Sequence, residues 1–229
     1  MSSIGSATAG AWFLLPSFFS IAASAGTDAP AVLTCPNAAV SIVAQASVDN
    51  NEICYGAEDA IAFFERLSIA PTHPLVVEIV HRLPDVVGET AVGCYLEEEQ
   101  SILVLDYTEF AKSKTWFDVP VDRSLYRSLV THEVAHAISD CNMAIPEPSI
   151  QAKEYLAYVA MFVTMDRNLR ERIMNRNPVE AFDRESKINT TIYLCDPMRF
   201  AVRAYRHYLN KGNGDAFLFK VLSGQALAN

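Results

Sequence analysis

The amino-acid sequence predicts an α+β fold, with a small amino-terminal sheet and a helix followed by an all-helical half. Short runs rich in Val, Ile and Leu, separated by turn residues, are confined to the part before Pro120. Beyond Pro120, apolar residues recur at helical spacing. Because 51% of the 229 residues are hydrophobic, the chain can bury a sizeable core. We therefore expect a single domain over 26–229, mixed α/β at 26–120 and helical at 121–229.

Residues 1–25 have the layout of a secretory signal peptide. They contain no Lys, Arg, Asp or Glu, their centre is apolar, and Ala23-Ser24-Ala25 provides a small-residue cleavage pattern before Gly26. The apolar centre is too short to cross a bilayer. We expect a secreted or periplasmic protein, and the alternatives for this segment are a buried apolar helix or a membrane tether.

The mixed part is expected to contain four strands and one helix. A strand candidate covers 38–46, and apolar residues recur at helical spacing over 57–67. Three runs rich in Val, Ile and Leu follow at 75–80, 91–96 and 101–107, and each predicts a strand.

Capping signals predict the helices of the second part. Asp122 is expected to cap a helix that ends near Ser139. A proline-containing break follows, and the next helix is expected over 149–165. An Asp-Pro pair, typical of an N-cap and first helical position, predicts a late helix over 197–208. A terminal helical segment is expected after the Gly-Asn-Gly loop at 212–214.

One motif in this sequence points to metal chemistry. Residues 131–136 read Thr-His-Glu-Val-Ala-His and contain the pattern H-E-x-x-H at His132, Glu133 and His136. Residues four apart lie on one face of a helix, so both imidazoles can bind one metal ion. Glu133 is turned by about 100° but lies in the same turn, so its carboxylate can reach a water molecule on the metal. The alternative is a pair of core histidines that bind no metal.

A catalytic zinc ion with two His ligands needs a third protein ligand and an open fourth position. Glu154 lies 18 positions after His136 (154 − 136), and a second helix packed across the first would return it to the metal. We therefore expect Glu154 to be the third ligand. Asp140 and Glu147 are the competing ligands, although Asp140 suits a helix end or a contact to a His ring nitrogen better.

The H-E-x-x-H motif, together with Glu154 on a second helix and Ala157 three residues later, resembles the gluzincin branch of the zincin metallopeptidases. The resemblance covers about 122–160 and extends to the small sheet before it, which implies a zincin-like fold. It implies that the two His and Glu154 bind Zn²⁺ and that Glu133 is the general base. Beyond the motif the chain resembles a small, uncharacterised gluzincin-like family.

The implied function is that of a zinc metallopeptidase, a hydrolase acting on a peptide or protein substrate. Zinc would lower the pKa of its water and polarise the scissile carbonyl, while the base takes the proton and passes it to the leaving amine. Tyr158, Tyr205 and His207 are candidates for stabilising the oxyanion, with packing or surface roles as the alternative. The strand at 101–107 could be the edge along which an extended peptide lies, or an ordinary strand.

Five cysteines follow the signal segment, namely Cys35, Cys54, Cys94, Cys141 and Cys195. Export permits disulfides, and two bridges with one remaining thiol is the simplest count. We expect a Cys141–Cys195 bridge, because each of these residues lies at a helix boundary beside the motif. Buried free thiols are the alternative. Since the chain has no C-x-x-C pair, a cysteine zinc site is not expected.

The charge balance limits the classes of partner. The chain has a formal net charge of −9, with 18 Lys and Arg against 27 Asp and Glu. Nucleic acids and anionic membranes bind basic surfaces, so we expect neither as a partner. The main alternative to an enzyme is a catalytically silent zincin-fold binding module that keeps the metal site. A helical structural protein with a coincidental motif is the third possibility.

Overall fold

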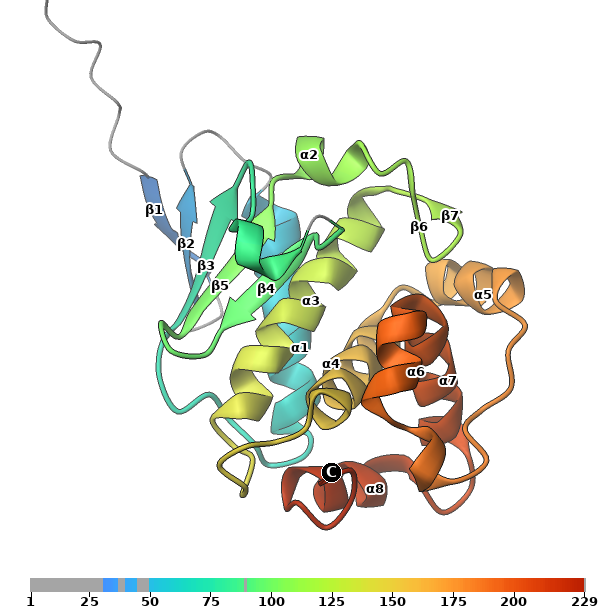
Figure 1. Ribbon diagram of the computed structural model, residues 1–229. Coiled ribbons are helices and arrows are strands. Elements are labelled where there is room, and N and C mark those ends of the chain that lie inside the picture. Colours follow the sequence, from blue (N-terminus) through green and yellow to red (C-terminus); the bar gives the residue numbers. More distant parts are fainter. Residues whose placement is uncertain (1–30, 37–39, 45–49, 89, 229) are drawn as a thin grey trace, which may run out of the picture.

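The computed structural model describes residues 31–36, 40–44, 50–88 and 90–228 (Figure 1). The predicted signal peptide lies outside the described residues. Over the described part, a small mixed sheet near the amino terminus is followed by a helical half, which confirms the predicted α+β class. No helix among the described residues is long and apolar enough to cross a membrane.

The first layer is a five-stranded sheet in the order β1-β2-β3-β5-β4 (Figure 1). Strands β2, β3 and β5 are parallel, whereas the edge strands β1 and β4 are antiparallel to their neighbours. The strands are β1 (Ala31–Thr34), β2 (Val40–Ala44), β3 (Leu75–Val80), β4 (Gly93–Leu96) and β5 (Ser101–Leu105).

The four predicted strands are confirmed as β2 to β5, with ends that differ by a few residues, and β1 was not predicted. The proposal that the strand at 101–107 forms an edge is wrong, because β5 lies between β3 and β4. Tyr107 does not belong to this strand either. Asp106 caps a short helix, α2 (Tyr107–Ala111), by accepting a hydrogen bond from the Glu109 amide at 3.0 Å.

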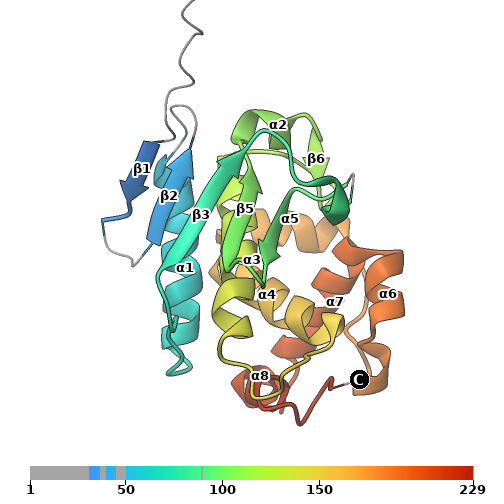
Figure 2. The ribbon, with the colours of Figure 1, turned by 60° about the vertical axis from the view of Figure 1, so that its left-hand side comes forward.

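Two helices, α1 (Asn50–Glu65) and α3 (Arg123–Asp140), pack against each other and against the sheet (Figures 1 and 2). The helix predicted at 57–67 begins earlier, at Asn50. The prediction started too late because Gly56 and the polar residues before it obscure the helical pattern. Gly56 permits the close approach of the two helices, since a Cβ there would lie 2.6 Å from the Arg127 carbonyl oxygen. The Thr131 hydroxyl, directly before the motif, donates to the Gly56 carbonyl at 3.0 Å. The motif helix is therefore held against α1.

The second turn of α1 is tied to the amino-terminal strands by a disulfide between Cys35 and Cys54. The predicted Cys141–Cys195 bridge is wrong, because both thiols are free, as is that of Cys94. The Cys141 thiol donates to the Ile138 carbonyl within the end of α3, whereas Cys195 is exposed at the end of another helix. The chain thus has one bridge instead of two.

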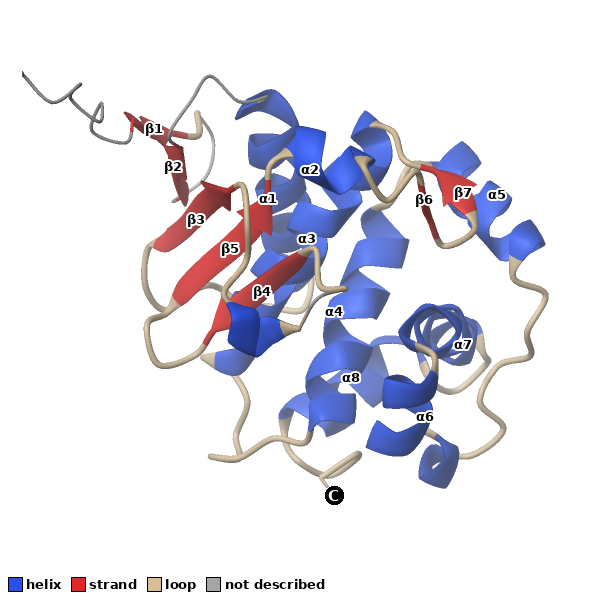
Figure 3. Cartoon of the chain, turned by 45° about the horizontal axis from the view of Figure 1, so that its top comes forward, coloured by secondary structure: helices blue, strands red, loops and turns tan. Residues whose placement is uncertain are grey.

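The helical half is built around α4, which packs against α1 and α3 and against later helices (Figures 1 and 3). Its helices are α4 (Ile150–Thr164), α5 (Arg167–Arg176), α6 (Thr190–Cys195), α7 (Pro197–Leu209) and α8 (Gly214–Leu222). Three predicted helix starts are confirmed, because the side chains of Asp122, Ser149 and Asp196 accept hydrogen bonds from backbone amides three residues later. Short elements connect these parts: the hairpin β6 (Thr115–Trp116) and β7 (Val119–Pro120), and the 3-10 helices η1 (Asp85–Val87) and η2 (Glu185–Lys187).

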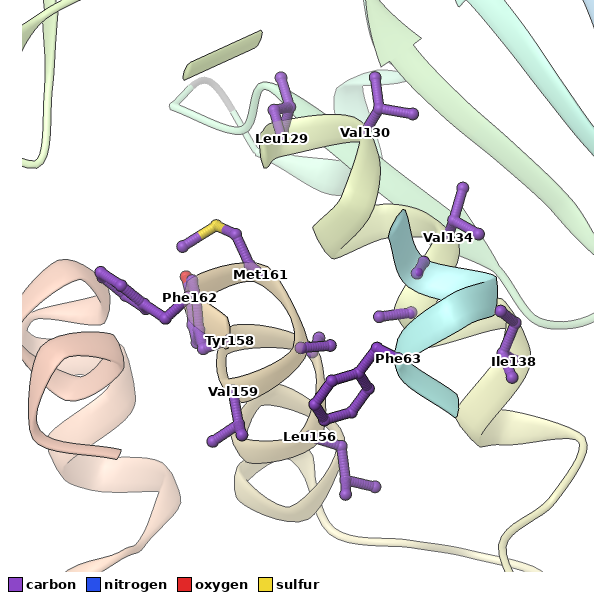
Figure 4. Packing of buried hydrophobic residues seen from close by; sticks show 14 of the residues in the cluster. Phe63, Leu129, Val130, Val134, Ile138, Leu156, Tyr158, Val159, Met161 and Phe162 are labelled. Carbon is purple, nitrogen blue, oxygen red and sulfur yellow. The ribbon is translucent and has the colours of Figure 1, made fainter. Parts of the chain in front are cut away.

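One hydrophobic cluster runs from the sheet through the helices (Figure 4). In its centre, Phe63 of α1, Ile138 of α3 and Leu156 of α4 are almost fully buried. Burial of each such side chain contributes roughly 1.5–3 kcal/mol to folding. This packing fixes the angle between α3 and α4, and therefore fixes how the polar faces of the two helices meet.

Candidate metal centre

The motif histidines and Glu154 meet where α3 and α4 pack together. The ring Nε2 atoms of His132 and His136 lie 3.1 Å apart. Glu154 Oε2 lies 3.6 Å from His132 Nε2, and Glu154 Oε1 lies 3.6 Å from His136 Nε2. Among the described residues this is the one group of three or more potential metal ligands, so Asp140 and Glu147 are not part of it.

These separations suit a tetrahedral zinc ion. Bonds of about 2.0–2.1 Å to four ligands put neighbouring ligand atoms about 3.3 Å apart. The observed 3.1 and 3.6 Å lie on either side of that value. In addition, Glu154 Oε2 is buried and has no hydrogen-bond partner in the described part of the chain. A cation would satisfy a buried carboxylate oxygen that is otherwise costly to leave unpaired.

The buried environment controls the charge of each group. Burial lowers the pKa of His132 well below its usual value, and it lowers that of His136 to about 4. Both rings are therefore neutral near pH 7, which is the form that binds metal. Burial raises the pKa of Glu154 to about 7, so a proton competes with a metal for this carboxylate.

Glu133 lies beside the histidines and below the edge strand. Its side chain is 5% exposed, and burial together with the charge of Glu154 raises its pKa well above the usual value. A Cβ added at Gly93 of β4 would lie 2.7 Å from both Cγ and Oε1 of Glu133. The absence of a side chain at this position therefore lets the strand pass directly over the Glu133 carboxylate.

Gly93→Ala should displace Glu133 and lower the free energy of unfolding by about 1–3 kcal/mol, because the new methyl group has no space. In a Glu133→Ala background the Glu133 atoms that the new methyl group would meet are absent. Gly93→Ala should therefore lower the free energy of unfolding much less in that background. Urea unfolding of wild type, both single variants and the double variant measures this coupling. Equal costs in the two backgrounds would contradict the close contact.

The group opens into a pocket of about 300 Å³. Its walls come mainly from β4, α3 and α4, and are formed by Val87, Gly93, Cys94, Tyr95, Glu97, His132, Glu133, His136, Asp140, Ile150, Lys153 and Glu154. Lys153 is ion-paired with Glu97 at the rim. Asp140 accepts a hydrogen bond from the Tyr95 hydroxyl at 3.3 Å, and not from a histidine ring. The edge strand and the proposed ligands thus share one cavity.

The three oxyanion candidates are not brought together. The ring of Tyr158 lies 4.3 Å from that of His132, measured between centroids, and burial raises the pKa of its hydroxyl. Tyr205 stacks on Phe162, and His207 Nδ1 is hydrogen-bonded to the Tyr155 hydroxyl at 2.8 Å. None of the three candidates lines the pocket. Of the three, only Tyr158 is in contact with the motif.

Sequence reasoning missed Tyr193 of α6. Its hydroxyl faces Glu154 and favours the charged form of that carboxylate. Neither spacing nor a local motif indicates this contact, because it depends on how α6 packs beside α4.

Comparisons with known proteins place the chain in a family. Residues 40–229 match a family model described as a family of unknown function (DUF6639). No curated protein and no solved structure matches the chain. Because the match covers most of the sequence, the chain belongs to this family of unknown function, DUF6639.

Proposed function

We propose that this protein is a zinc-dependent metallopeptidase of the zincin type. The observation that carries the proposal is the convergence of His132, His136 and Glu154, with separations of 3.1–3.6 Å between ligand atoms. Two imidazoles and one carboxylate form a donor set used by catalytic zinc sites, which leave a fourth position open. Glu133, the next residue after His132, supplies the carboxylate that such hydrolysis needs.

Each side chain has a role in the proposed reaction. When bound, zinc supplies Lewis-acid activation of a water molecule and of the scissile carbonyl. The Glu133 carboxylate takes the proton of the attacking water and delivers it to the leaving amine. Burial and the neighbouring charge of Glu154 raise its pKa, which makes the carboxylate a stronger base than an exposed glutamate. Tyr158 does not line the pocket, but of the oxyanion candidates it alone contacts the motif, and burial keeps its hydroxyl protonated, so it is the donor that we propose.

The edge strand supports a peptide as the substrate. β4 is at the end of the sheet, and Gly93, Cys94 and Tyr95 of this strand line the pocket. An extended peptide can add to such an edge through main-chain hydrogen bonds, so that its scissile bond crosses the pocket. We therefore propose that β4, and not the strand at 101–107, is the edge along which the peptide lies. The Cys35–Cys54 disulfide supports a secreted or periplasmic location, which we propose as well.

Digestion of a peptide library by the zinc-loaded protein tests the proposed function. We expect cleavage that a chelator abolishes and added zinc restores, with products identified by mass spectrometry. The same preparation carrying His132→Ala is the matched control for contaminating peptidases. Bound zinc without any cleavage would favour the silent binding module instead.

Zinc affinity should depend on pH through Glu154. Its pKa of about 7 in the metal-free protein means that zinc must displace a proton below pH 7. Apparent affinity should thus fall about tenfold per pH unit below 7 and level off above it. The histidines add little to this slope above about pH 5, because burial keeps them neutral. Competition titrations with a chromophoric chelator in the Glu133→Gln background measure the profile, and a flat profile would contradict it.

A further inference from the structure

A second cavity lies in the helical half of the molecule. It has a volume of about 420 Å³ and is formed by α6, α7 and the segment after α5, a region visible in Figures 1 and 3. It shares no lining residue with the pocket of the metal centre. Val179, Ile192 and Phe200 make much of its wall apolar. Its size and lining are typical of sites that bind small organic molecules.

One arginine side chain of the cavity, that of Arg203, has no ion-pair partner in the described part of the chain. Arg203 lines the cavity from α7, with its guanidinium carbon 4.3 Å from the centroid of the Phe182 ring. Its Nε is buried without a hydrogen-bond partner, and in the described part of the chain no carboxylate forms an ion pair with it. Arg199, the other arginine of the cavity, is instead paired with Asp196 at 3.4 Å. An arginine beside an apolar wall without an acceptor is a place for a ligand to supply one.

We propose that this cavity binds a small amphipathic carboxylate, with its acidic group on Arg203 and its hydrocarbon chain against Ile192 and Phe200. The apolar wall favours a hydrocarbon chain over a peptide as the ligand. A peptide backbone would bury amide groups, and the apolar wall offers few partners for them. General attraction of anions does not account for such binding, because the whole chain carries a net charge of −9. Two acidic residues, Glu180 and Asp196, also line the cavity, and Asp196 is paired with Arg199. The proposed contact therefore depends on Arg203, the arginine of the cavity that has no ion pair in the described part of the chain.

Isothermal titration with octanoate tests the proposal, with octan-1-ol and octylammonium as probes of the same chain length. We expect saturable binding of one octanoate per protein and weaker binding of both uncharged and cationic probes. Arg203→Gln should weaken octanoate binding about tenfold to hundredfold, because a charge-assisted contact is lost, and should leave octan-1-ol unchanged. Arg206→Gln is the matched control: it lies on the same helix outside the cavity, where its guanidinium donates to the Met174 carbonyl.

A second readout locates the ligand and does not depend on a variant. Cys195 lines the cavity and is exposed, whereas the other free thiols, Cys94 and Cys141, lie outside it. Octanoate should therefore slow alkylation of Cys195 alone, as followed by peptide mass spectrometry. Unchanged alkylation of Cys195, absence of saturable binding in the millimolar range, or equal octanoate affinity of folded Arg203→Gln would each overturn the proposal. Arg203→Met removes the charge but keeps a long apolar side chain, and it replaces Arg203→Gln if the latter does not fold.

Discussion

Glu133→Gln should abolish most peptide hydrolysis while the protein still binds zinc. The amide has nearly the same shape as the carboxylate and fits under Gly93, but it cannot accept the proton of the attacking water. Loss of a general base typically lowers the rate by about 10²–10⁴-fold. We therefore expect kcat to fall by this factor, with KM and zinc content close to those of wild type. Initial rates on a cleaved peptide, with zinc measured in the same samples, give the answer.

Glu147→Gln is the control for this substitution. It removes a carboxylate that is exposed and that does not line the pocket, so both rate and zinc content should be unchanged. A Glu133→Gln protein with the wild-type rate would remove Glu133 from the reaction. A Glu133→Gln protein that has lost its zinc would instead make Glu133 a ligand.

The second large effect is expected at Glu154. Glu154→Ala removes one of three proposed ligands and leaves two histidines, so zinc affinity should fall by at least about 100-fold. Purified wild type should contain close to one zinc per chain and the variant close to none, as measured by elemental analysis. Asp140→Ala should retain its zinc, because Asp140 pairs with Tyr95 and is not part of the His-Glu group. Loss of zinc in Asp140→Ala with retention in Glu154→Ala would assign the third ligand to Asp140.

Local signals account for the parts of the fold that could be predicted. Asp122 caps α3 as expected, and Ser149 caps α4 at its predicted start, because a capping side chain bonds to an amide only three residues away. The order of the strands depends on pairing between distant segments, which has no such signal. The antiparallel pairing of β4 with β5, which makes β4 the edge strand of the sheet, could therefore not be predicted from the sequence. The disulfide was missed for the same reason, since Cys35 and Cys54 meet only through the packing of α1 on the strands.

In the candidate site, too, relations between residues close in sequence could be predicted, whereas contacts between distant segments could not. His132 and His136 could be placed together because both lie on one helix, and Glu154 because a short break joins α3 to α4. Tyr193 and Gly93 reach the site from elements remote in sequence, so neither could be found from spacing. Tyr205 and His207 were candidates because their residue types suit an oxyanion site, and the structure packs them against Phe162 and Tyr155, outside the pocket.

Zinc K-edge X-ray absorption of the metal-loaded protein tests the central claim most directly. We predict a four-coordinate ion with two imidazole nitrogens and carboxylate or water oxygens at about 2.0–2.2 Å, and no sulfur at about 2.3 Å. Sulfur is the informative alternative, because the free thiol of Cys94 lines the same pocket. A sulfur shell, or a spectrum without imidazole scattering, would contradict a centre built from His132, His136 and Glu154.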